Sequence, residues 1–342
     1  MLRLPPFELL RPESLEEARD LLATHSARPL AGGTDLLVNL KLGSVAAQTL
    51  VSLAAVPELR GIREEAGELV IGAMTPLAEV ARNELVRRQA PALAQAAGVV
   101  ASPQLRTMGT LGGNLLLDTR CQWINQSHFW RAALGFCLKK DGTKCHVVEK
   151  GKRCVAAASN DTAPALLTRG ASLSLLGAAT RTLPLEELWR VDGADHLALE
   201  EGELLVEVRL PLATEDGQLS HRGAYGKLRR RGSIDFPLLG LAVGLELDTE
   251  GVIRSASVAA VALQARPLLL PSVAEKLSGV AAAGPELASA IEAAGELAHK
   301  RLKPLDNIPG DAWWRREMVP VLLGRTVRAA LDGSGPAHGD PQ

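Results

Sequence analysis

Two glycine-rich segments have the residue types needed to hold a phosphate group. Residues 30–35 read Leu-Ala-Gly-Gly-Thr-Asp, and residues 110–114 read Thr-Leu-Gly-Gly-Asn. Paired glycines let backbone N–H groups approach a ligand closely, and a following helix offers unpaired donors and the positive end of its dipole. Neither segment is a G-x-G-x-x-G or Walker motif. Two such loops predict a long ligand with a diphosphate near its middle, such as a dinucleotide, whose polar atoms Thr110 and Asn114 can bind.

The four cysteines of the chain all lie within residues 121–154, at Cys121, Cys137, Cys145 and Cys154. A reducing compartment disfavours disulfides. A structural zinc site usually contains a C-x2-4-C pair, which this segment lacks, whereas an iron–sulfur cluster needs four thiolates and tolerates irregular spacing. Three interpretations stay open from the residues alone, namely an iron–sulfur cluster, then zinc, then unligated cysteines.

The cysteine segment also differs from the rest of the chain in charge. Its only acids are Asp141 and Glu149, and they are outnumbered by seven basic residues, Arg131, Lys139, Lys140, Lys144, Lys150, Lys152 and Arg153. Trp123, Phe129, Trp130 and Phe136 lie in the same stretch. Such basic, aromatic-rich surroundings suit a negatively charged cluster that must be shielded from water. We expect residues 116–159 to form an insertion with its own organising centre.

The whole chain is close to electrical neutrality, which narrows the classes of partner. Its 342 residues carry a formal net charge of -1, so neither nucleic acid nor an anionic membrane is indicated. No apolar run approaches the roughly 20 residues of a membrane helix. The first residues lack the apolar region of a secretory signal. We therefore expect a cytoplasmic protein.

The spacing of apolar residues and caps predicts the elements that position these segments. Helices are expected over 11–24 with Ser14 as cap, from a Thr34 cap to Gly43, and over 77–86, 91–100 and 311–331. Strands are expected over 48–53, 68–71, 171–176, 204–210, 236–247 and 252–263. The basic run 227–231 reads most simply as a solvated edge strand. A polar stretch at 211–220 marks a domain boundary, so that 1–220 forms one domain, 221–332 a second, and 333–342 a disordered tail.

The glycine segments, taken with Lys227, Arg230 and Asp235, resemble the FAD-binding subunit of molybdenum hydroxylases, the xanthine dehydrogenase and carbon monoxide dehydrogenase family. The resemblance extends over about residues 5–330. It implies an α+β fold, with a vanillyl-alcohol-oxidase-type FAD-binding domain followed by a smaller C-terminal domain of sheet and helices. No residue of such a subunit is expected to act as a catalytic acid or base.

The same resemblance implies which residues bind FAD. Both glycine loops line the site in this family, an aspartate in a D-x-x-P segment contacts FAD, and a lysine reaches the flavin. The residues so implied here are Pro29, Leu30, Ala31, Gly32, Gly33, Thr34, Asp35, Leu36, Thr107, Thr110, Gly112, Gly113, Asn114, Asp161, Leu205 and Lys227.

Ordinary family members lack the insertion, which resembles that of one subgroup, the 4-hydroxybenzoyl-CoA reductases, through Asp118-Thr119-Arg120-Cys121 and Lys144-Cys145-His146-Val147. The resemblance implies a [4Fe-4S] cluster on the four cysteines and reduced ferredoxin as electron donor. From its positive charge, we expect the insertion to form a docking face for an acidic ferredoxin. It also implies a molybdenum-cofactor large subunit and a small [2Fe-2S] subunit, assembled as a dimer of heterotrimers. Two alternatives remain, namely an oxidising hydroxylase that passes electrons outward, and a non-redox nucleotide-binding protein with a structural zinc loop.

Overall fold

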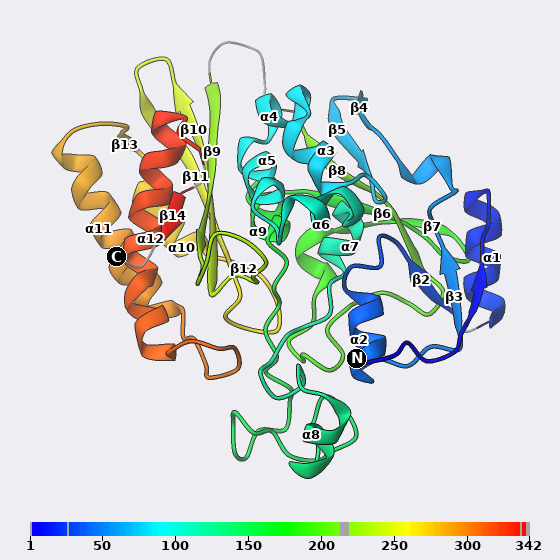
Figure 1. Ribbon diagram of the computed structural model, residues 1–342. Coiled ribbons are helices and arrows are strands. Elements are labelled where there is room, and N and C mark those ends of the chain that lie inside the picture. The colour runs from blue at the N-terminus through cyan, green and yellow to red at the C-terminus, as the bar shows by residue number, and fades with distance from the viewer. Residues whose placement is uncertain (1, 26, 213–218, 336, 340–342) are drawn as a thin grey trace.

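The computed structural model describes residues 2–25, 27–212, 219–335 and 337–339. Helices and sheets are mixed throughout, as expected, and three sheets lie with helices between and outside them (Figure 1). The predicted boundary loop at 211–220 lies largely outside the described residues. None of the helices in the described ranges is long and apolar enough to cross a membrane.

The N-terminal sheet is parallel and has three strands, which position the first glycine loop. Its order is β1 (Glu8–Leu10), β3 (Thr49–Ser52) and β2 (Arg28–Leu30). The preceding helix α1 (Leu15–His25) buries Ala18 and Leu22 against this sheet. As predicted, Ser14 caps that helix, because its Oγ accepts a hydrogen bond of 3.2 Å from the backbone N–H of Glu17. The first glycine loop leaves β2 and leads into α2 (Leu36–Leu42).

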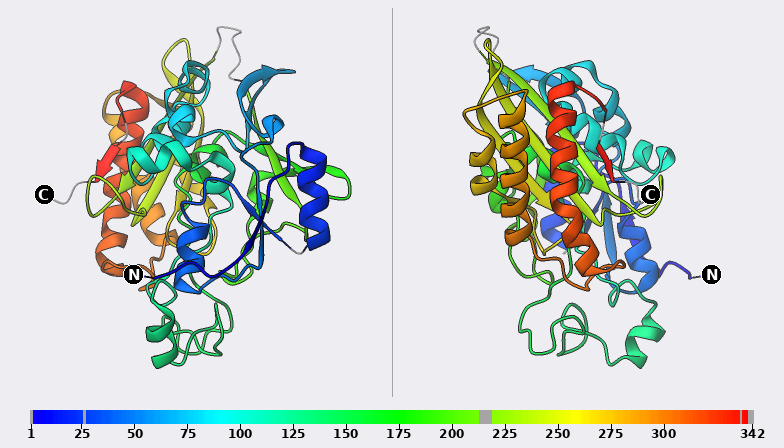
Figure 2. Two further views of the ribbon diagram at one scale, coloured as in Figure 1. Left: turned by 45° about the vertical axis from the view of Figure 1, so that its right-hand side comes forward. Right: turned by 90° about the vertical axis from the view of Figure 1, so that its left-hand side faces the viewer.

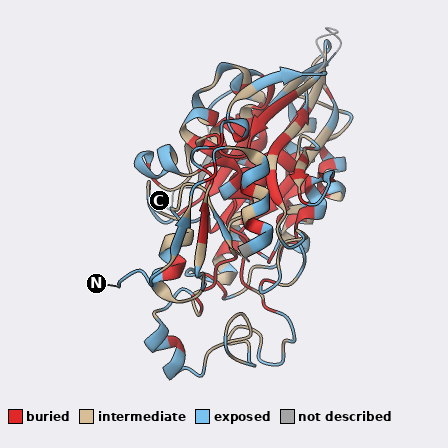
Figure 3. Cartoon of the chain, turned by 90° about the vertical axis from the view of Figure 1, so that its right-hand side faces the viewer, coloured by how far each residue is buried: buried red, intermediate tan, exposed pale blue. Residues whose placement is uncertain are grey.

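The N-terminal part of the chain also contains an antiparallel sheet of five strands. Its order is β4 (Ile62–Glu65), β5 (Glu68–Gly72), β8 (Leu204–Pro211), β6 (Ser172–Leu176) and β7 (Thr180–Pro184). The turns η1 (Pro57–Leu59) and η2 (Leu185–Leu188) adjoin this sheet. Its strands β5 and β8 are almost wholly buried. Buried residues gather in the interior of the molecule (Figure 3).

A layer of short helices separates the five-stranded sheet from the C-terminal sheet. It comprises α3 (Leu77–Arg82), α4 (Glu84–Gln89), α5 (Pro91–Gly98), α6 (Pro103–Met108), α7 (Leu111–Leu115) and α9 (Thr162–Leu167). The single helix predicted over 77–86 is wrong, because Asn83 adopts an extended conformation and its Oδ1 accepts a hydrogen bond of 3.1 Å from the N–H of Val86. The side chain thus caps a second helix.

The C-terminal domain is a sheet covered on its outer face by two long helices (Figure 2). Its strand order is β12 (Leu268–Leu269), β11 (Val252–Val261), β10 (Leu239–Asp248), β9 (Leu219–Leu228) and β14 (Ala337–Gly339), with β13 (Val280–Ala281) beside β11. The covering helices are α11 (Pro285–Arg301) and α12 (Ala312–Asp332), and the short α10 (Pro271–Ala274) and η3 (Glu275–Leu277) precede them. Asp311 caps α12 through the N–H of Trp314.

The composition of the tail predicts disorder over 333–342, and this is wrong for the part that forms β14. Residues 337–339 pair in parallel with Gly226, Lys227 and Leu228 of β9. The unpaired backbone groups of a sheet edge provide a ready partner for any extended segment that reaches them. The tail therefore covers the edge of the strand that contains Lys227.

The segment 116–159, predicted to be an insertion and called the insertion below, projects from the body at the bottom of Figure 1 and contains α8 (His128–Ala133). Its two ends meet in an isolated antiparallel bridge, where Arg120 and Ala157 exchange backbone hydrogen bonds of 2.7 Å. Ser127 caps α8 through the N–H of Trp130 at 3.5 Å. The insertion is thus a separate loop closed at a defined neck.

Candidate functional site

The tertiary structure places the two glycine loops against each other. A methyl group added at Gly32 would lie 1.7 Å from the carbonyl oxygen of Met108, just before the second loop. The position of a methyl group on Gly113 would be 3.9 Å from the Cβ of Ala31. Because only glycine allows so close an approach of two backbones, these residues join the loops into one site.

In the first loop, Gly33 has φ of 71°, a conformation that favours glycine. Thr34 was expected to cap α2, and this is wrong. The N-cap is Asp35, and its side chain makes no capping hydrogen bond. Its carboxylate instead accepts a hydrogen bond of 2.9 Å from the Nδ2 of Asn39 and forms an ion pair with Arg120. The helix ends at Gly43, as expected, in the left-handed conformation.

In the second loop, the predicted ligand-binding side chains also shape the loop. The Oγ1 of Thr110 accepts a hydrogen bond of 3.1 Å from the N–H of Gly113, which caps α7. The Oδ1 of Asn114 accepts hydrogen bonds from the N–H of Thr162 at 3.1 Å and from its hydroxyl at 2.6 Å. Asn160 donates to the carbonyls of Asn114 and Leu115. Residues that follow the insertion therefore hold the loop that precedes it.

The surface left open by the loops consists largely of small residues and backbone. Pro29, Thr34, Thr107 and Gly113 are exposed, and the predicted contacts from Leu30 to Gly33, with Asp35 and Leu36, are half-buried. Gly112 is buried, and a methyl group there would lie 2.8 Å from the Cβ of Ala73. A cradle of glycines suits the diphosphate of FAD, which needs close backbone approach rather than long side chains.

Asp161 and Lys227, which the resemblance implies are FAD contacts, bind each other in the structure and are shielded from solvent. The Nζ of Lys227 donates to the Oδ2 of Asp161 at 3.1 Å, and the Tyr225 hydroxyl donates to Oδ1 at 2.7 Å. Lys227 is 0% exposed and Asp161 2%. The Lys227 ammonium also donates to the carbonyls of Val99 and Asp235 at 3.1 and 3.3 Å. An ammonium has three donors, so these partners use all of them.

Burial dominates the electrostatics of this group. Burial raises the pKa of Asp161, and the Lys227 ammonium opposes that rise. Burial likewise raises the pKa of Tyr225 well above its ordinary value, and the charge of Asp161 adds to the effect. The expectation of a solvated edge strand over 227–231 is wrong for Lys227 and for Arg229, which is 5% exposed and paired with Asp235 at 2.6 Å. Arg230 and Arg231 are exposed.

Leu205 lies in β8 opposite Leu175 and is 2% exposed. It belongs to the hydrophobic core between the five-stranded sheet and the helices. The structure therefore gives Leu205 a packing role.

The four cysteines are all free thiols and lie in one part of the insertion. Cys121 and Cys154 share a buried apolar cluster with Ile124 and Ala156, and Cys137 packs against it. Cys145 is half-buried, and its Sγ accepts a hydrogen bond of 3.4 Å from the N–H of Val148. The N–H of Ala156 donates to the Sγ of Cys154 at 3.4 Å. Backbone donors aimed at sulfur are the interactions that tune metal-bound thiolates.

The described residues contain no group of three or more His, Cys, Asp or Glu arranged around a single metal ion. Burial raises the pKa of Cys154 to about 11, and it also raises the pKa of Cys121, with added repulsion from Cys137 and Cys145. These thiols are therefore protonated at neutral pH unless a cationic group replaces the protons. A four-iron cluster binds each thiolate at a different corner, so its ligands lie farther apart than those of one ion.

The insertion is fastened to both domains. The Lys139 ammonium donates to Asp118 Oδ1, to Thr119 Oγ1 and to the carbonyl of Gly193, each at 2.7 Å. Arg131 is 2% exposed and donates to the carbonyl of Leu42, at the end of α2. These two cations are structural, so the exposed positive charge of the insertion is smaller than the sequence sum indicates.

On the other side of the insertion, the backbone N–H of Gln122 donates to the carbonyl of Asn307 at 2.7 Å. The Nδ2 of Asn307 in turn donates to the carbonyl of Val155 at 2.6 Å. His146 Nε2 lies 2.6 Å from the carbonyl oxygen of Phe136, and its ring packs 5.0 Å from that of Trp123. The histidine thus helps to pack the loop.

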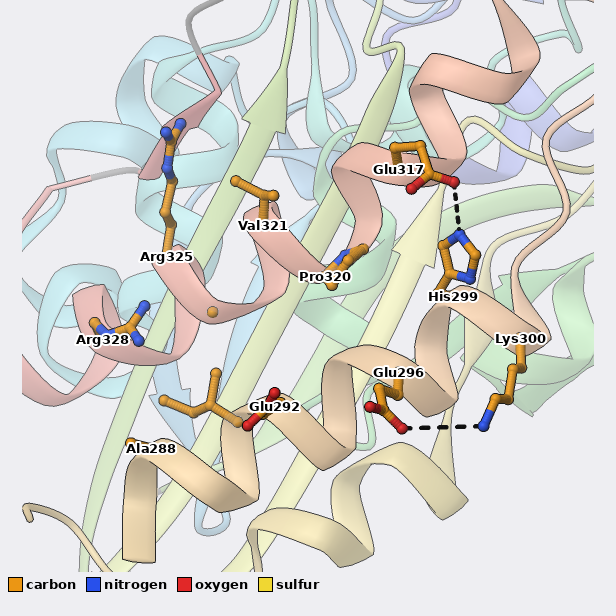
Figure 4. A pocket seen from close by; sticks show the side chains of 12 residues that line it. Ala288, Glu292, Glu296, His299, Lys300, Glu317, Pro320, Val321, Arg325 and Arg328 are labelled. Atoms are coloured by element: carbon orange, nitrogen blue, oxygen red, sulfur yellow. Dashed lines mark hydrogen bonds and ion pairs between the residues drawn. The ribbon is translucent and has the colours of Figure 1, made fainter. Parts of the chain in front are cut away.

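A groove of about 550 Å³ lies elsewhere, between α11 and α12 (Figure 4). The His299–Glu317 pair, at 2.9 Å, and the Glu296–Lys300 pair, at 4.0 Å, lie along it. Both helices cover the outer face of the C-terminal sheet, away from the glycine loops. The groove therefore takes no part in the candidate site.

Sequence reasoning missed two contributors to the site. Arg120 was quoted only as part of a motif, although it pairs with the first glycine loop, and its position directly before Cys121 was the available signal. Tyr225 lies two residues before Lys227, so both side chains point to the same face of β9, and this period-two spacing could have identified it.

Comparison with known proteins shows which families this architecture matches. The family model described as the FAD binding domain in molybdopterin dehydrogenase matches residues 5–213, and that of the CO dehydrogenase flavoprotein C-terminal domain matches 223–330. The chain is 30% identical to the carbon monoxide dehydrogenase medium chain of Hydrogenophaga pseudoflava, covering 95% of this chain and 97% of that protein. It is 25% identical to the nicotinate dehydrogenase FAD-subunit of Eubacterium barkeri, covering 95% and 96%.

Solved structures agree with these matches. A carbon monoxide dehydrogenase structure from Hydrogenophaga pseudoflava aligns with a TM-score of 0.77 and 27% identity, covering 96% of this chain and 99% of that one. A quinoline 2-oxidoreductase from Pseudomonas putida 86 aligns with a TM-score of 0.75 and 25% identity, covering 97% and 99%. The likeness extends over both domains.

Proposed function

Because the chain belongs to the FAD-binding medium subunits of the molybdenum hydroxylase family, we propose that it serves a reductive member of that family. In this proposal it holds FAD and a [4Fe-4S] cluster and transfers electrons to a molybdenum enzyme that removes the phenolic hydroxyl of 4-hydroxybenzoyl-CoA, giving benzoyl-CoA. Bond breaking takes place on a partner subunit. The four-cysteine insertion is the observation that favours a reductive enzyme over the other members of the family.

The FAD site in this proposal is the joined pair of glycine loops. Gly32, Gly33 and Gly113 present backbone to the diphosphate, and Thr34 and Thr107 are exposed residues of the two loops. Asp161 and Lys227 support the second loop indirectly, because Asn160 and Thr162, on either side of Asp161, hold that loop by hydrogen bonds. Bound FAD supplies electron transfer in single or paired steps.

The cluster site in this proposal is the set Cys121, Cys137, Cys145 and Cys154. Four unpaired thiols in one partly buried loop, with backbone N–H groups directed at sulfur, suit the donor set of a [4Fe-4S] cluster. The cysteine segment also lacks the C-x2-4-C pair that is usual in a structural zinc site. Bound at this place, the cluster supplies one-electron transfer.

The proposed partners are a molybdenum-cofactor large subunit, a small [2Fe-2S] subunit and reduced ferredoxin. The exposed or half-exposed cations of the insertion are Lys140, Lys144, Lys150, Lys152 and Arg153. Beside them, α8 exposes Phe129 to 74% and Trp130 to 58%. Exposed cations and exposed aromatic side chains on one projecting segment suit an acidic protein that docks transiently.

An oxidising hydroxylase subunit is the second candidate function. The names of the matched relatives favour it, since they include a nicotinate dehydrogenase FAD-subunit and a nicotine 6-hydroxylase medium subunit. In that case the insertion serves another electron acceptor, and the FAD site is unchanged.

The proposal is tested by assaying iron and acid-labile sulfide in anaerobically purified protein, beside a Cys145→Ser variant. We expect about four iron and about four sulfide per chain, with clear loss in the variant. Zinc, or neither element, removes the reason to choose a reductive enzyme and leaves the FAD site standing. Reduction of 4-hydroxybenzoyl-CoA by the whole complex with reduced ferredoxin then separates the two candidate functions.

A further inference from the structure

Arg120 lies where three distant segments of the chain meet. Its guanidinium forms an ion pair with Asp35 of the first glycine loop and lies 4.8 Å from the centre of the Phe236 ring. The Nη1 atom donates to the Oδ1 of Asn125, inside the insertion, at 3.4 Å. The side chain is 8% exposed, although it carries a full charge. A buried arginine of this kind needs its carboxylate partner.

The backbone of Arg120 is as firmly placed as its side chain. Arg120 and Ala157 exchange two hydrogen bonds of 2.7 Å, which close the neck of the insertion. Cys121 follows directly, and Cys154 precedes Ala157 by three positions. Arg120 thus closes the neck with its backbone and binds the first glycine loop with its guanidinium group.

Asp35 belongs to the first glycine loop, and a residue of α2 holds its carboxylate. It lies two positions after Gly33, and it accepts a hydrogen bond of 2.9 Å from Asn39 in α2. Asp35 therefore connects the first glycine loop, through its position in the chain, to Arg120 through its side chain. Planar guanidinium–carboxylate pairs are directional, so they transmit orientation as well as attraction.

We infer that Arg120 is a positioning residue that couples the cysteine insertion to the first glycine loop, so that occupancy of the FAD site orders the cluster site. The inference rests on the proposed function for the identity of both sites. Coupling between two sites is reciprocal, so an ordered insertion also strengthens FAD binding. Lys139 and Arg131 fasten the insertion to other parts of the body and do not reach this loop.

The test is hydrogen exchange of the backbone in the full chain, with and without FAD, for the native protein and for Arg120→Gln. In the native protein, FAD should slow exchange both in residues 30–36 and in the insertion, the latter by about 5- to 150-fold, the usual range of coupling between sites. In Arg120→Gln, FAD should still protect residues 30–36, but protection of the insertion should be lost. FAD affinity should fall by the same factor.

Three further variants keep the test decisive. Arg120→Lys should retain part of the coupling because it keeps the charge. If Arg120→Gln does not fold, Asp35→Asn should uncouple the insertion in the same way, since it removes the other partner. Arg181→Gln is the matched control, because Arg181 pairs with Glu203 at 2.7 Å in the same domain without contacting either site.

Two failures are distinguishable. Persistent FAD-dependent protection of the insertion in Arg120→Gln or in Asp35→Asn overturns the coupling and leaves the proposed function intact. Absence of FAD binding by the native protein overturns the proposed function itself, together with the coupling that rests on it.

Discussion

At the scale of single residues, the buried pair of Lys227 and Asp161 is the most informative feature of the site. The family resemblance implies that both residues contact FAD, yet all three donors of Lys227 are used by this chain's own oxygens. Asp161 lies between Asn160 and Thr162, which hold the second glycine loop. We therefore expect this pair to support the cofactor site from beneath.

Replacing Lys227 by methionine should lower the free energy of unfolding by about 3–5 kcal/mol, because it leaves the Asp161 carboxylate buried without its cation. The double variant Lys227→Met/Asp161→Asn should recover a large part of that loss. Urea unfolding followed by tryptophan fluorescence measures both. A loss below about 1 kcal/mol in the single variant contradicts the view that the two charges depend on each other.

At the scale of elements, the contact between the two glycine loops creates the site. The two loops are far apart in the sequence, and only the tertiary structure brings Gly32 to the backbone of Met108. The insertion lies between the second loop and the residues that hold it. The second loop, the insertion and the residues that hold the loop, Asn160 and Thr162, thus follow one another in the chain.

Gly32→Ala should weaken FAD binding by at least about tenfold, equal to about 1.4 kcal/mol, because the new methyl group would lie 1.7 Å from the Met108 carbonyl oxygen and the loops would have to separate. Titration of flavin fluorescence measures the affinity. The control is Gly98→Ala, where the added methyl group meets only the Cβ of Ala81 at an ordinary 3.7 Å. Equal affinities in the two variants would mean that the loops need not touch.

At the scale of the whole molecule, charge is distributed unevenly although the net charge is only -1. The insertion, which has several exposed cations, projects from one end of the molecule (Figure 1). Long-range charge steers association and is screened by salt. The position of the insertion therefore suits the docking of a separate electron-transfer protein.

Electron transfer from reduced ferredoxin should slow as ionic strength rises, and the variant Lys150→Glu/Lys152→Glu should be slower than the native protein at low salt, by about tenfold or more. Stopped-flow bleaching of the flavin measures the rate. Arg87→Glu/Lys276→Glu reverses two exposed charges outside the insertion and should leave the rate unchanged. A rate insensitive to salt would argue against docking on the insertion.

The sequence by itself determined the parts of this protein that local patterns encode. Glycine pairs before a helix, the clustered cysteines and the apolar periods of most strands and helices can be read within a few residues, because backbone freedom, thiol chemistry and burial act at short range. The family match over both domains agrees with those patterns. The break at Asn83 was not predicted, since a single capping hydrogen bond there outweighs a continuous helical pattern.

Only the tertiary structure decided which of these residues act together. Asp35 and not Thr34 is the N-cap residue of α2, and its side chain pairs with Arg120. Lys227 is buried instead of solvated, and the tail adds β14 to the edge of β9. Each of these outcomes depends on partners far away in the chain, and the cost of burying an unpaired charge or leaving a strand edge open selects among the alternatives. No pattern along the sequence contains those distances, so only the folded chain could fix them.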